Sequence, residues 1–262
     1  NTSISLIAIL DKEIPTEFSS EAINLADDAK AVPLGKREDL RKLPLVTVDG
    51  VDARDFDDAI FAEADTDKKN PGGWHLIVCI ADVAFYVRPG DALDQEAQKR
   101  SNSVYFPDQV VPMLPEVLSN GWCSLKPHED RPCMAAHMWI SAEGNLVRHR
   151  FARGLMKSHA RLTYEQLQAA HDGDPDDNTL LLNHVVSPLY GAYEALSKAR
   201  HNRGVLELDL PERRVIIGED GLVEGVETRM RFDSHKLIEE FMITANVAAA
   251  ETLEKKRQPC MY

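Results

Sequence analysis

The sequence predicts an α+β fold, in which helices surround a mixed or antiparallel central sheet, and three observations support this class. Short apolar runs rich in β-branched residues lie between turn-forming residues, which is typical of strands; the longest covers residues 74–83. Three further runs surround the turn Glu143-Gly144-Asn145 and predict a meander. A long helix is predicted at residues 234–257, because apolar residues recur there at helical spacing.

The predicted elements follow one another along the whole chain. A short strand is expected at residues 3–10, and a helix at 21–31 that begins from a cap at Ser19 or Ser20. The strands expected in the sheet and in a separate hairpin are 45–48, 74–83, 85–87, 135–140, 146–151, 154–157, 215–217 and 222–226. The expected helices are 92–100 with a cap near Asp91, 112–118, 164–171, 180–201 and 234–257.

An acidic segment near the start of the predicted sheet is the main candidate site. One short stretch holds a single arginine and five carboxylates, which are Asp49, Asp52, Asp55, Asp57 and Asp58. Like charges this close raise one another's pKa unless cations lie among them. The flanking residues are apolar, so a strand that ends in a turn, followed by a second buried element, is expected to gather the acids at a strand end. Several carboxylates around hard divalent cations are the usual machinery of phosphodiester hydrolysis.

Two other interpretations of this segment are a solvated acidic loop and a calcium-binding loop. The apolar flanks and the tight spacing argue against the solvated loop. An EF-hand needs oxygen ligands at positions 1, 3 and 5, glycine at 6 and glutamate at 12. Counted from Asp49, position 12 is Ile60; counted from Asp52, positions 3 and 5 are Arg54 and Phe56. The EF-hand interpretation therefore fails.

Composition limits the class of protein without naming an activity. The chain of 262 residues is long enough for one large domain or two small ones. It has no apolar run near the roughly 18 residues of a membrane span and no recognisable signal peptide, so membrane contact is not expected. The four cysteines are widely spaced, which favours reduced thiols and a cytoplasmic protein. The net charge of −13 argues, taken alone, against a nucleic-acid partner.

The order of motifs, however, resembles a known nuclease family. The segment from Thr47 to Ile60 is similar to the acidic motif of the RNase II/RNase R (RNB) family of 3′→5′ exoribonucleases, and within it to the bacterial RNase R group. Further similar segments, in the family's order, are 80–83, 103–107, 112–119, 123–125, 158–164 and 235–240. The resemblance runs from about residue 40 to the last residue.

The resemblance implies an RNB-type catalytic domain with a defined chemistry. The implied reaction is processive, sequence-independent hydrolysis of RNA from single-stranded 3′ ends to nucleoside 5′-monophosphates, with Mg²⁺, or alternatively Mn²⁺, as cofactor. Asp49, Asp55, Asp57 and Asp58 would hold or orient the metal, with Asp57 and Asp58 nearest to the chemistry.

Other site residues follow from the same resemblance. Tyr105 would stack on the base of the 3′-terminal nucleotide, and Glu239 would be the active-site glutamate on the long helix. Because that helix is expected to be buried on most sides, its glutamates are expected to be paired or used. His159 and Arg161 are candidates for phosphate binding, with a solvated arginine as the alternative. Asp82 is interpreted as a structural aspartate that bonds turn amides, with a further metal or water ligand as the alternative.

The resemblance also implies a domain organisation. Residues 1–39 are expected to be the remnant of a preceding cold-shock domain with its linker, and residues 40–262 the N-terminal portion of an RNB catalytic domain. Family members use a second aromatic near the position of residues 204–210, where none stands here, and they carry a later arginine motif and an S1 domain. The chain is therefore expected to be a fragment with weak or no activity of its own. The alternatives are a non-catalytic RNA-binding or regulatory fragment, and a phosphatase or nuclease acting on DNA.

Overall fold

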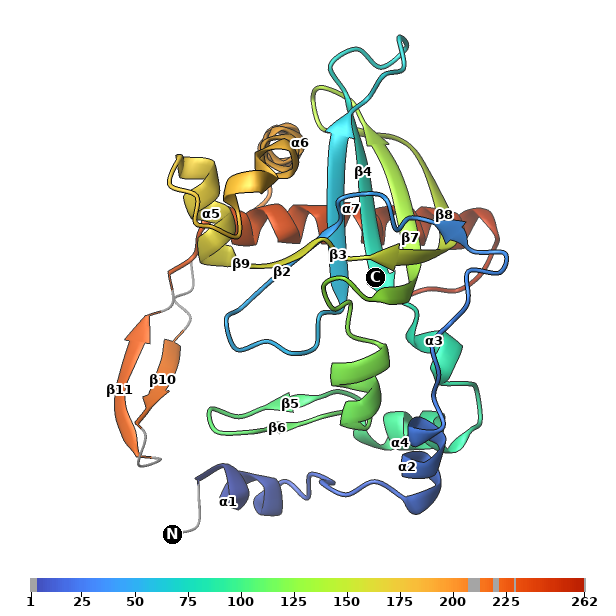
Figure 1. Cartoon of the computed structure of the whole chain (residues 1–262), viewed down its shortest axis with the longest axis vertical. Helices are drawn as coiled ribbons and strands as arrows, with labels where there is room; N and C mark the ends of the chain where they lie inside the picture. The colour runs from blue at the N-terminus through green and yellow to red at the C-terminus, as the bar shows by residue number, and fades with distance from the viewer. Residues whose placement is uncertain (1–3, 207–212, 219–221, 229, 262) are drawn as a thin grey trace. The chain divides into compact units, whose positions relative to one another are not determined.

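The computed structural model describes residues 4–206, 213–218, 222–228 and 230–261 (Figure 1). The chain divides into two compact units, which are described separately. The larger unit comprises residues 31–82, 123–206 and 232–262, and the smaller unit comprises residues 1–30, 83–122 and 207–231. None of the helices in the described part of the chain has the length and apolar composition needed to cross a bilayer.

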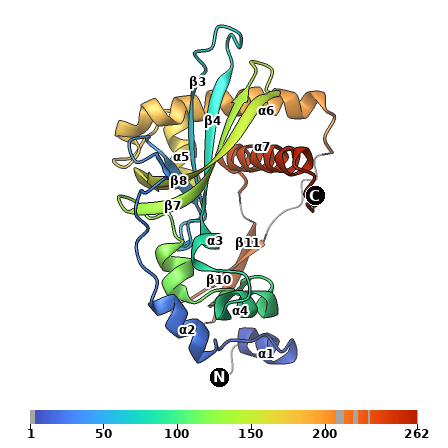
Figure 2. The ribbon, with the colours of Figure 1, turned by 90° about the vertical axis from the view of Figure 1, so that its right-hand side faces the viewer.

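The larger unit is built on a mixed sheet of seven strands in the order β1-β8-β7-β4-β3-β2-β9. The strands are β1 Glu38–Asp39, β2 Val46–Asp49, β3 Asp58–Ala64, β4 Trp74–Ala81, β7 Asp130–Ile140, β8 Leu146–Lys157 and β9 Ala160–Thr163. The inner pairs are antiparallel, whereas β1 pairs with β8 and β2 with β9 in parallel. The predicted mixed sheet and its hairpin of β7 and β8, seen beside β4 in Figure 2, are thus confirmed.

Helices cover one face of this sheet. They are α5 Tyr164–Asp172, the short 3-10 helix η2 Leu180–Leu182, α6 Asn183–Asn202 and α7 Asp233–Lys255. Helix α6 packs on β3, and α7 crosses β4, β7 and β8 (Figure 1). Alternate strand residues point to this face and form one core with both helices; among them are Ile60, Leu76 and Met138, packed with Leu189 and Phe241. Apolar residues at helical spacing on α6 and α7 and at alternate positions on the strands therefore face one another and form this core.

Ion pairs and caps fix the helices of the larger unit. Glu240 of α7 is 3 % exposed and contacts Arg200 of α6, with Oε1 2.7 Å from Nη1. Thr163 and Gln166 form a reciprocal capping box at the start of α5. At the start of α7, the Ser234 hydroxyl donates to the Tyr164 carbonyl at 2.8 Å. These contacts hold α5, α6 and α7 in register with one another.

The smaller unit contains mostly short elements. They are α1 Ile4–Asp11, α2 Ser20–Asp27, α3 Val83–Tyr86, α4 Ala92–Arg100, β5 Val104–Tyr105, β6 Val110–Val111, the π-helix η1 Val117–Trp122, β10 Arg213–Ile217 and β11 Val223–Thr228. Strands β5 and β6 form one antiparallel hairpin, and β10 and β11 form another. The predicted helix at 92–100 is confirmed with its cap, since the Asp91 side chain accepts a hydrogen bond from the Asp94 amide.

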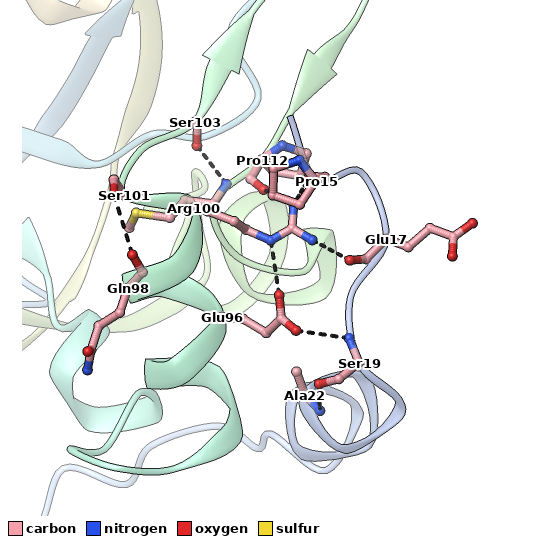
Figure 3. A network of polar contacts seen from close by, with 11 residues as sticks. Pro15, Glu17, Ser19, Ala22, Glu96, Gln98, Arg100, Ser101, Ser103 and Pro112 are labelled. Atoms are coloured by element: carbon pink, nitrogen blue, oxygen red, sulfur yellow. Dashed lines mark hydrogen bonds and ion pairs between the residues drawn. The ribbon is translucent and has the colours of Figure 1, made fainter. Parts of the chain in front are cut away.

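Arg100 ties the N-terminal segment of the smaller unit to α4 (Figure 3). Its guanidinium donates to the carbonyls of Pro15 and Glu17, each at 2.6 Å, and to Glu96 Oε2 at 3.3 Å. The second oxygen of Glu96 accepts the Ser19 amide at 3.2 Å. Arg100 and Glu96 are both buried, so their charges are compensated by each other and by these backbone groups.

Three local predictions are wrong. The segment 3–10 was expected as a strand, but Ile4–Asp11 is helical. The segment 85–87 was expected to continue the sheet, but Val83–Tyr86 is a helical turn. The short helix expected at 112–118 occurs later, as a π-helix at Val117–Trp122. The first two errors have the same cause. A short apolar run contains too few residues to show whether its apolar positions follow the period of a helix or that of a strand.

Candidate active site

The acidic segment lies where two neighbouring strands of the larger unit meet a turn. Asp49 is the last residue of β2, and Asp58 is the first residue of the adjacent β3. The two strands are antiparallel, with Val46 opposite Ile60. The carbonyl of Asp57 accepts the Ala81 amide of β4 at 2.9 Å, which brings the segment against a third strand. The acids are therefore gathered at a strand end, as the apolar flanks predicted.

Arg161 fixes the first half of the turn. It lies on β9, which runs parallel to β2 with Arg161 opposite Thr47. Its Nη2 donates to the carbonyls of Gly50 and Val51 at 2.8 and 2.7 Å. Because Arg161 holds these two carbonyls, the alternative that its side chain is only solvated is wrong. Phosphate binding by Arg161 stays a prediction.

Ser124 fixes the second half of the turn, and sequence reasoning missed it as an individual residue. It lies between η1 and β7 and is fully buried. Its hydroxyl donates to the Arg54 carbonyl at 2.9 Å and accepts the Phe56 amide at 3.1 Å. The next residue, Leu125, donates its amide to the Phe56 carbonyl at 2.8 Å. The only signal in the sequence was that residues 123–125 form one of the family-like segments.

Burial is the main electrostatic feature of the acidic segment. Burial, followed by repulsion from Asp55 and Asp57, raises the pKa of Asp49 to about 6, while Arg161 partly opposes this effect. Asp57 is exposed as a whole residue, but partial desolvation of its carboxylate and then repulsion from Asp55 raise its pKa to about 6. Burial, then Asp49 and Asp57, raise the pKa of Asp58 to about 7. The group therefore carries more negative charge at neutral pH than its surroundings stabilise, which favours a bound cation.

Two oxygens of this group are suited to such a cation. Asp49 Oδ2 and Asp58 Oδ2 are buried and have no hydrogen-bond partner within the described residues. Burial raises the pKa of the neighbouring Cys123 thiol to about 12, with Asp57 adding to the effect, so this cysteine stays neutral and is a poor ligand. The donors are then carboxylate oxygens, which fit a hard divalent ion such as Mg²⁺ or Mn²⁺.

The described residues do not form a preformed metal-binding site. Across residues 4–206, 213–218, 222–228 and 230–261, no three histidine, cysteine, aspartate or glutamate side chains converge closely enough to hold a metal ion. Like-charged carboxylates repel one another until a cation lies among them. The case for a bound metal therefore rests on two observations: within the described residues, Asp49 Oδ2 and Asp58 Oδ2 are buried without a hydrogen-bond partner, and the available donors are carboxylate oxygens, which suit a hard cation.

The structure separates the two glutamates of α7. Glu240 is buried against Arg200, whereas Glu239 is exposed. The helix was expected to be buried on most sides, but at Glu239 it is exposed, because consecutive helix residues point about 100° apart and only one of the two glutamates faces α6. Glu239 remains on the predicted helix, and its catalytic role stays a prediction.

Two further predicted residues have local structural surroundings. His159 is exposed at the bend between β8 and β9, where its amide donates to the Leu45 carbonyl at 2.7 Å. Asp82 is 5 % exposed and pairs with Arg37, Nη2 to Oδ2, at 2.7 Å. The structural interpretation of Asp82 is supported, but its partner is a guanidinium rather than turn amides.

Tyr105 lies in the smaller unit, on strand β5 opposite Val110. Tyr105 is 63 % exposed, which is unusual for a core tyrosine, and its role in base stacking stays a prediction. The segment 204–210, where a second aromatic was sought, lies mostly outside the described residues, which stop at 206 and resume at 213.

Comparison with known proteins places this geometry in a family. The family model described as the RNB domain matches residues 37–262. Ribonuclease R of Vibrio parahaemolyticus is 47% identical over 98% of this chain and 31% of its own length, and Ribonuclease R of Escherichia coli is 45% identical over 98% and 32%. The solved structure of Mycoplasma genitalium RNase R in complex with ribose methylated single-stranded RNA superposes with a TM-score of 0.89 at 26% identity, covering 97% of this chain and 39% of that one. The chain thus spans about a third of the length of these curated relatives. It belongs to the RNB family, with Ribonuclease R among its relatives.

Proposed function

We propose that this chain supplies the catalytic carboxylates of an exoribonuclease that hydrolyses single-stranded RNA from the 3′ end and releases nucleoside 5′-monophosphates. One observation carries the proposal: at the ends of adjacent strands, Asp49 Oδ2 and Asp58 Oδ2 are buried and have no hydrogen-bond partner among the residues that the structure describes. In a chain of the RNB family, buried acids with raised pKa are best explained as ligands of a divalent cation.

The acids have distinct tasks in this proposal. A bound Mg²⁺ or Mn²⁺ would act as a Lewis acid at the scissile phosphate and make water a better nucleophile at neutral pH. Asp58, with a pKa of about 7, must lose its proton to serve as a ligand. Arg161 opposes protonation of Asp49 through its positive charge, and so keeps that carboxylate in the binding form. Asp57, with a pKa of about 6, orients the attacking water, and Asp55 completes the donor set.

RNA as the substrate draws support from the chain and from its relatives. Tyr105, which is 63 % exposed, is the candidate for stacking on the terminal base, and stacking on any base suits a sequence-independent enzyme. Mycoplasma genitalium RNase R has been solved with single-stranded and with double-stranded RNA. We extend RNA binding to this chain, with His159 and Arg161 as candidates for phosphate contacts and Glu239 as a further active-site acid.

A labelled oligoribonucleotide tests the proposal in the intact protein. With Mg²⁺ or Mn²⁺ present, the RNA should shorten from its 3′ end, and Asp57→Asn should abolish turnover while it preserves RNA binding. A matched oligodeoxyribonucleotide should persist, because discrimination between the two sugars requires contacts to the 2′-hydroxyl. Equal turnover of wild type and Asp57→Asn would remove Asp57 from the mechanism.

The alternative is a non-catalytic RNA-binding role. The specific observation in its favour is that no metal-ready group of three ligand side chains exists within the described residues. The same experiment separates the two roles, since a binding module retains the RNA intact at every metal concentration.

A further inference from the structure

One buried hydroxyl holds both peptide groups that flank Asp55. The Arg54 carbonyl belongs to the peptide group before Asp55, and the Phe56 amide belongs to the peptide group after it. Ser124 Oγ donates to the first at 2.9 Å and accepts from the second at 3.1 Å. Since φ and ψ are the soft dihedrals of a residue, holding both neighbouring peptide planes fixes the direction in which the Asp55 side chain leaves the backbone.

Ser124 is itself anchored to the sheet. Its carbonyl accepts a hydrogen bond from Arg131 Nε at 2.9 Å, and Arg131 is 5 % exposed on β7. The amide of the following residue, Leu125, continues the contact by donating to the Phe56 carbonyl at 2.8 Å. The hydroxyl is therefore a fixed point of the larger unit, and its position does not depend on the acidic segment alone.

Distant donors hold five carbonyls of the acidic segment. Arg161 takes the carbonyls of Gly50 and Val51, Ser124 takes that of Arg54, Leu125 takes that of Phe56, and Ala81 takes that of Asp57. The directions of the side-chain carboxylates therefore depend on a backbone that these donors hold.

We propose that Ser124 is a positioning residue for the cation site, because its hydroxyl fixes the direction in which the Asp55 side chain leaves the backbone. This inference rests on the proposed function. Replacing Ser124 by alanine leaves the Arg54 carbonyl and the Phe56 amide buried without this partner, so the segment relaxes and Asp55 loses its fixed direction.

The test measures cation binding directly. Mn²⁺ is titrated into the intact wild-type protein, Ser124→Ala and Thr179→Val, and free Mn²⁺ is read from its electron paramagnetic resonance signal. Thr179→Val is the matched control: Thr179 is 1 % exposed, and its hydroxyl donates to Asp176 at 2.8 Å in the connection before η2, away from the acidic segment in sequence. Removing a residue that orients metal ligands costs about 10- to 100-fold in metal affinity.

Ser124→Ala is expected to raise the Mn²⁺ dissociation constant by about 10- to 100-fold, while Thr179→Val leaves it unchanged within error. Excess Mn²⁺ should restore RNA turnover in Ser124→Ala, which a general folding defect would not allow. If alanine prevents folding, Ser124→Cys keeps most of the volume and weakens both hydrogen bonds, because a thiol is a weak donor and acceptor.

A folded Ser124→Ala protein that binds Mn²⁺ as tightly as the wild type would overturn the positioning role. So would equal losses in Ser124→Ala and Thr179→Val, which would mark a stability effect alone. A wild-type protein that binds Mn²⁺ but leaves RNA intact would instead refute the proposed nuclease function, while the comparison of variants would still decide the role of Ser124.

Discussion

Asp58→Asn should make the metal-free protein more stable at high pH, and this prediction tests whether the acidic segment is electrostatically strained. Asp58 is the first residue of β3, and its Oδ2 is buried without a hydrogen-bond partner in the described residues. Burial, then Asp49 and Asp57, raise its pKa from 3.8 to about 7. An asparagine has nearly the same shape and carries no charge, so it removes the repulsion with little change in packing.

The sign of the pH dependence follows from proton binding. Between pH 4 and pH 7, the folded state holds the Asp58 proton more strongly than the unfolded state does, so the free energy of unfolding falls as pH rises through this range. A rise from 3.8 to about 7, at roughly 1.4 kcal/mol per pKa unit, gives an upper limit of about 4 kcal/mol. Because Asp49 and Asp57 titrate together with Asp58, we expect about 1–3 kcal/mol from this one substitution.

The assay is urea unfolding at a series of pH values between 4.5 and 8 in the presence of a chelator. The quantity to compare is the stability of Asp58→Asn minus that of the wild type, since other titrating groups cancel in this difference. Asp174→Asn, at an exposed position in the loop after α5, is the matched control. The difference should grow with pH for Asp58→Asn and stay flat for the control. A flat or falling difference for Asp58→Asn would refute the claim that this carboxylate is strained by burial.

Three other substitutions test the framework around the site. Arg200→Ala should lower the free energy of unfolding by about 3 kcal/mol in urea, because it leaves the buried Glu240 carboxylate without its cation; a loss below about 1 kcal/mol would contradict this. Burial lowers the pKa of His137 to about 4, so between pH 6.5 and pH 4 only the unfolded chain takes up a proton at this residue, and the wild type should lose at most about 3 kcal/mol of stability as the pH falls. His137→Gln should remove this loss; parallel curves of stability against pH for the two proteins would argue against the prediction. Gly144→Ala should cost about 2 kcal/mol or more in thermal unfolding, because Gly144 has φ +80° and a Cβ there would collide with the Ala195 carbonyl of α6; an unchanged melting temperature would show that the loop relaxes freely.

Local signals in the sequence predicted much of this fold. The cap at Asp91 and the bounds of α4 follow from residues within one helical turn of each other. The hairpin of β7 and β8 follows from its turn residues and from the apolar runs on either side of the turn. The apolar flanks of the acidic segment predicted a strand, a turn and a second buried element, and β2 and β3 confirm this order. In each case, the deciding residues are neighbours in the chain.

The predictions failed where a contact with a residue far away in the sequence determines the structure, or where the local sequence is compatible with both a helix and a strand. The apolar run that forms α1 has no neighbouring period to separate helix from strand. Glu239 and Glu240 are indistinguishable in sequence, and only the position of Arg200 on α6 determines which of them is buried. Asp82 looked like a residue that bonds its own turn, but its partner Arg37 stands 45 positions earlier in the chain.

The same distinction applies to the chemistry of the candidate site. The carboxylates lie in one short segment and are visible in the sequence, but the donors that hold this segment come from far away. Ser124 lies 68 positions after Phe56, and Arg161 lies 111 positions after Gly50. Cation affinity depends on the directions of the carboxylates as well as on their number, and these distant donors set the directions. An acidic motif moved into another strand and turn would therefore keep its charge and its repulsion, but it would lose the backbone support that allows several carboxylates to share one cation.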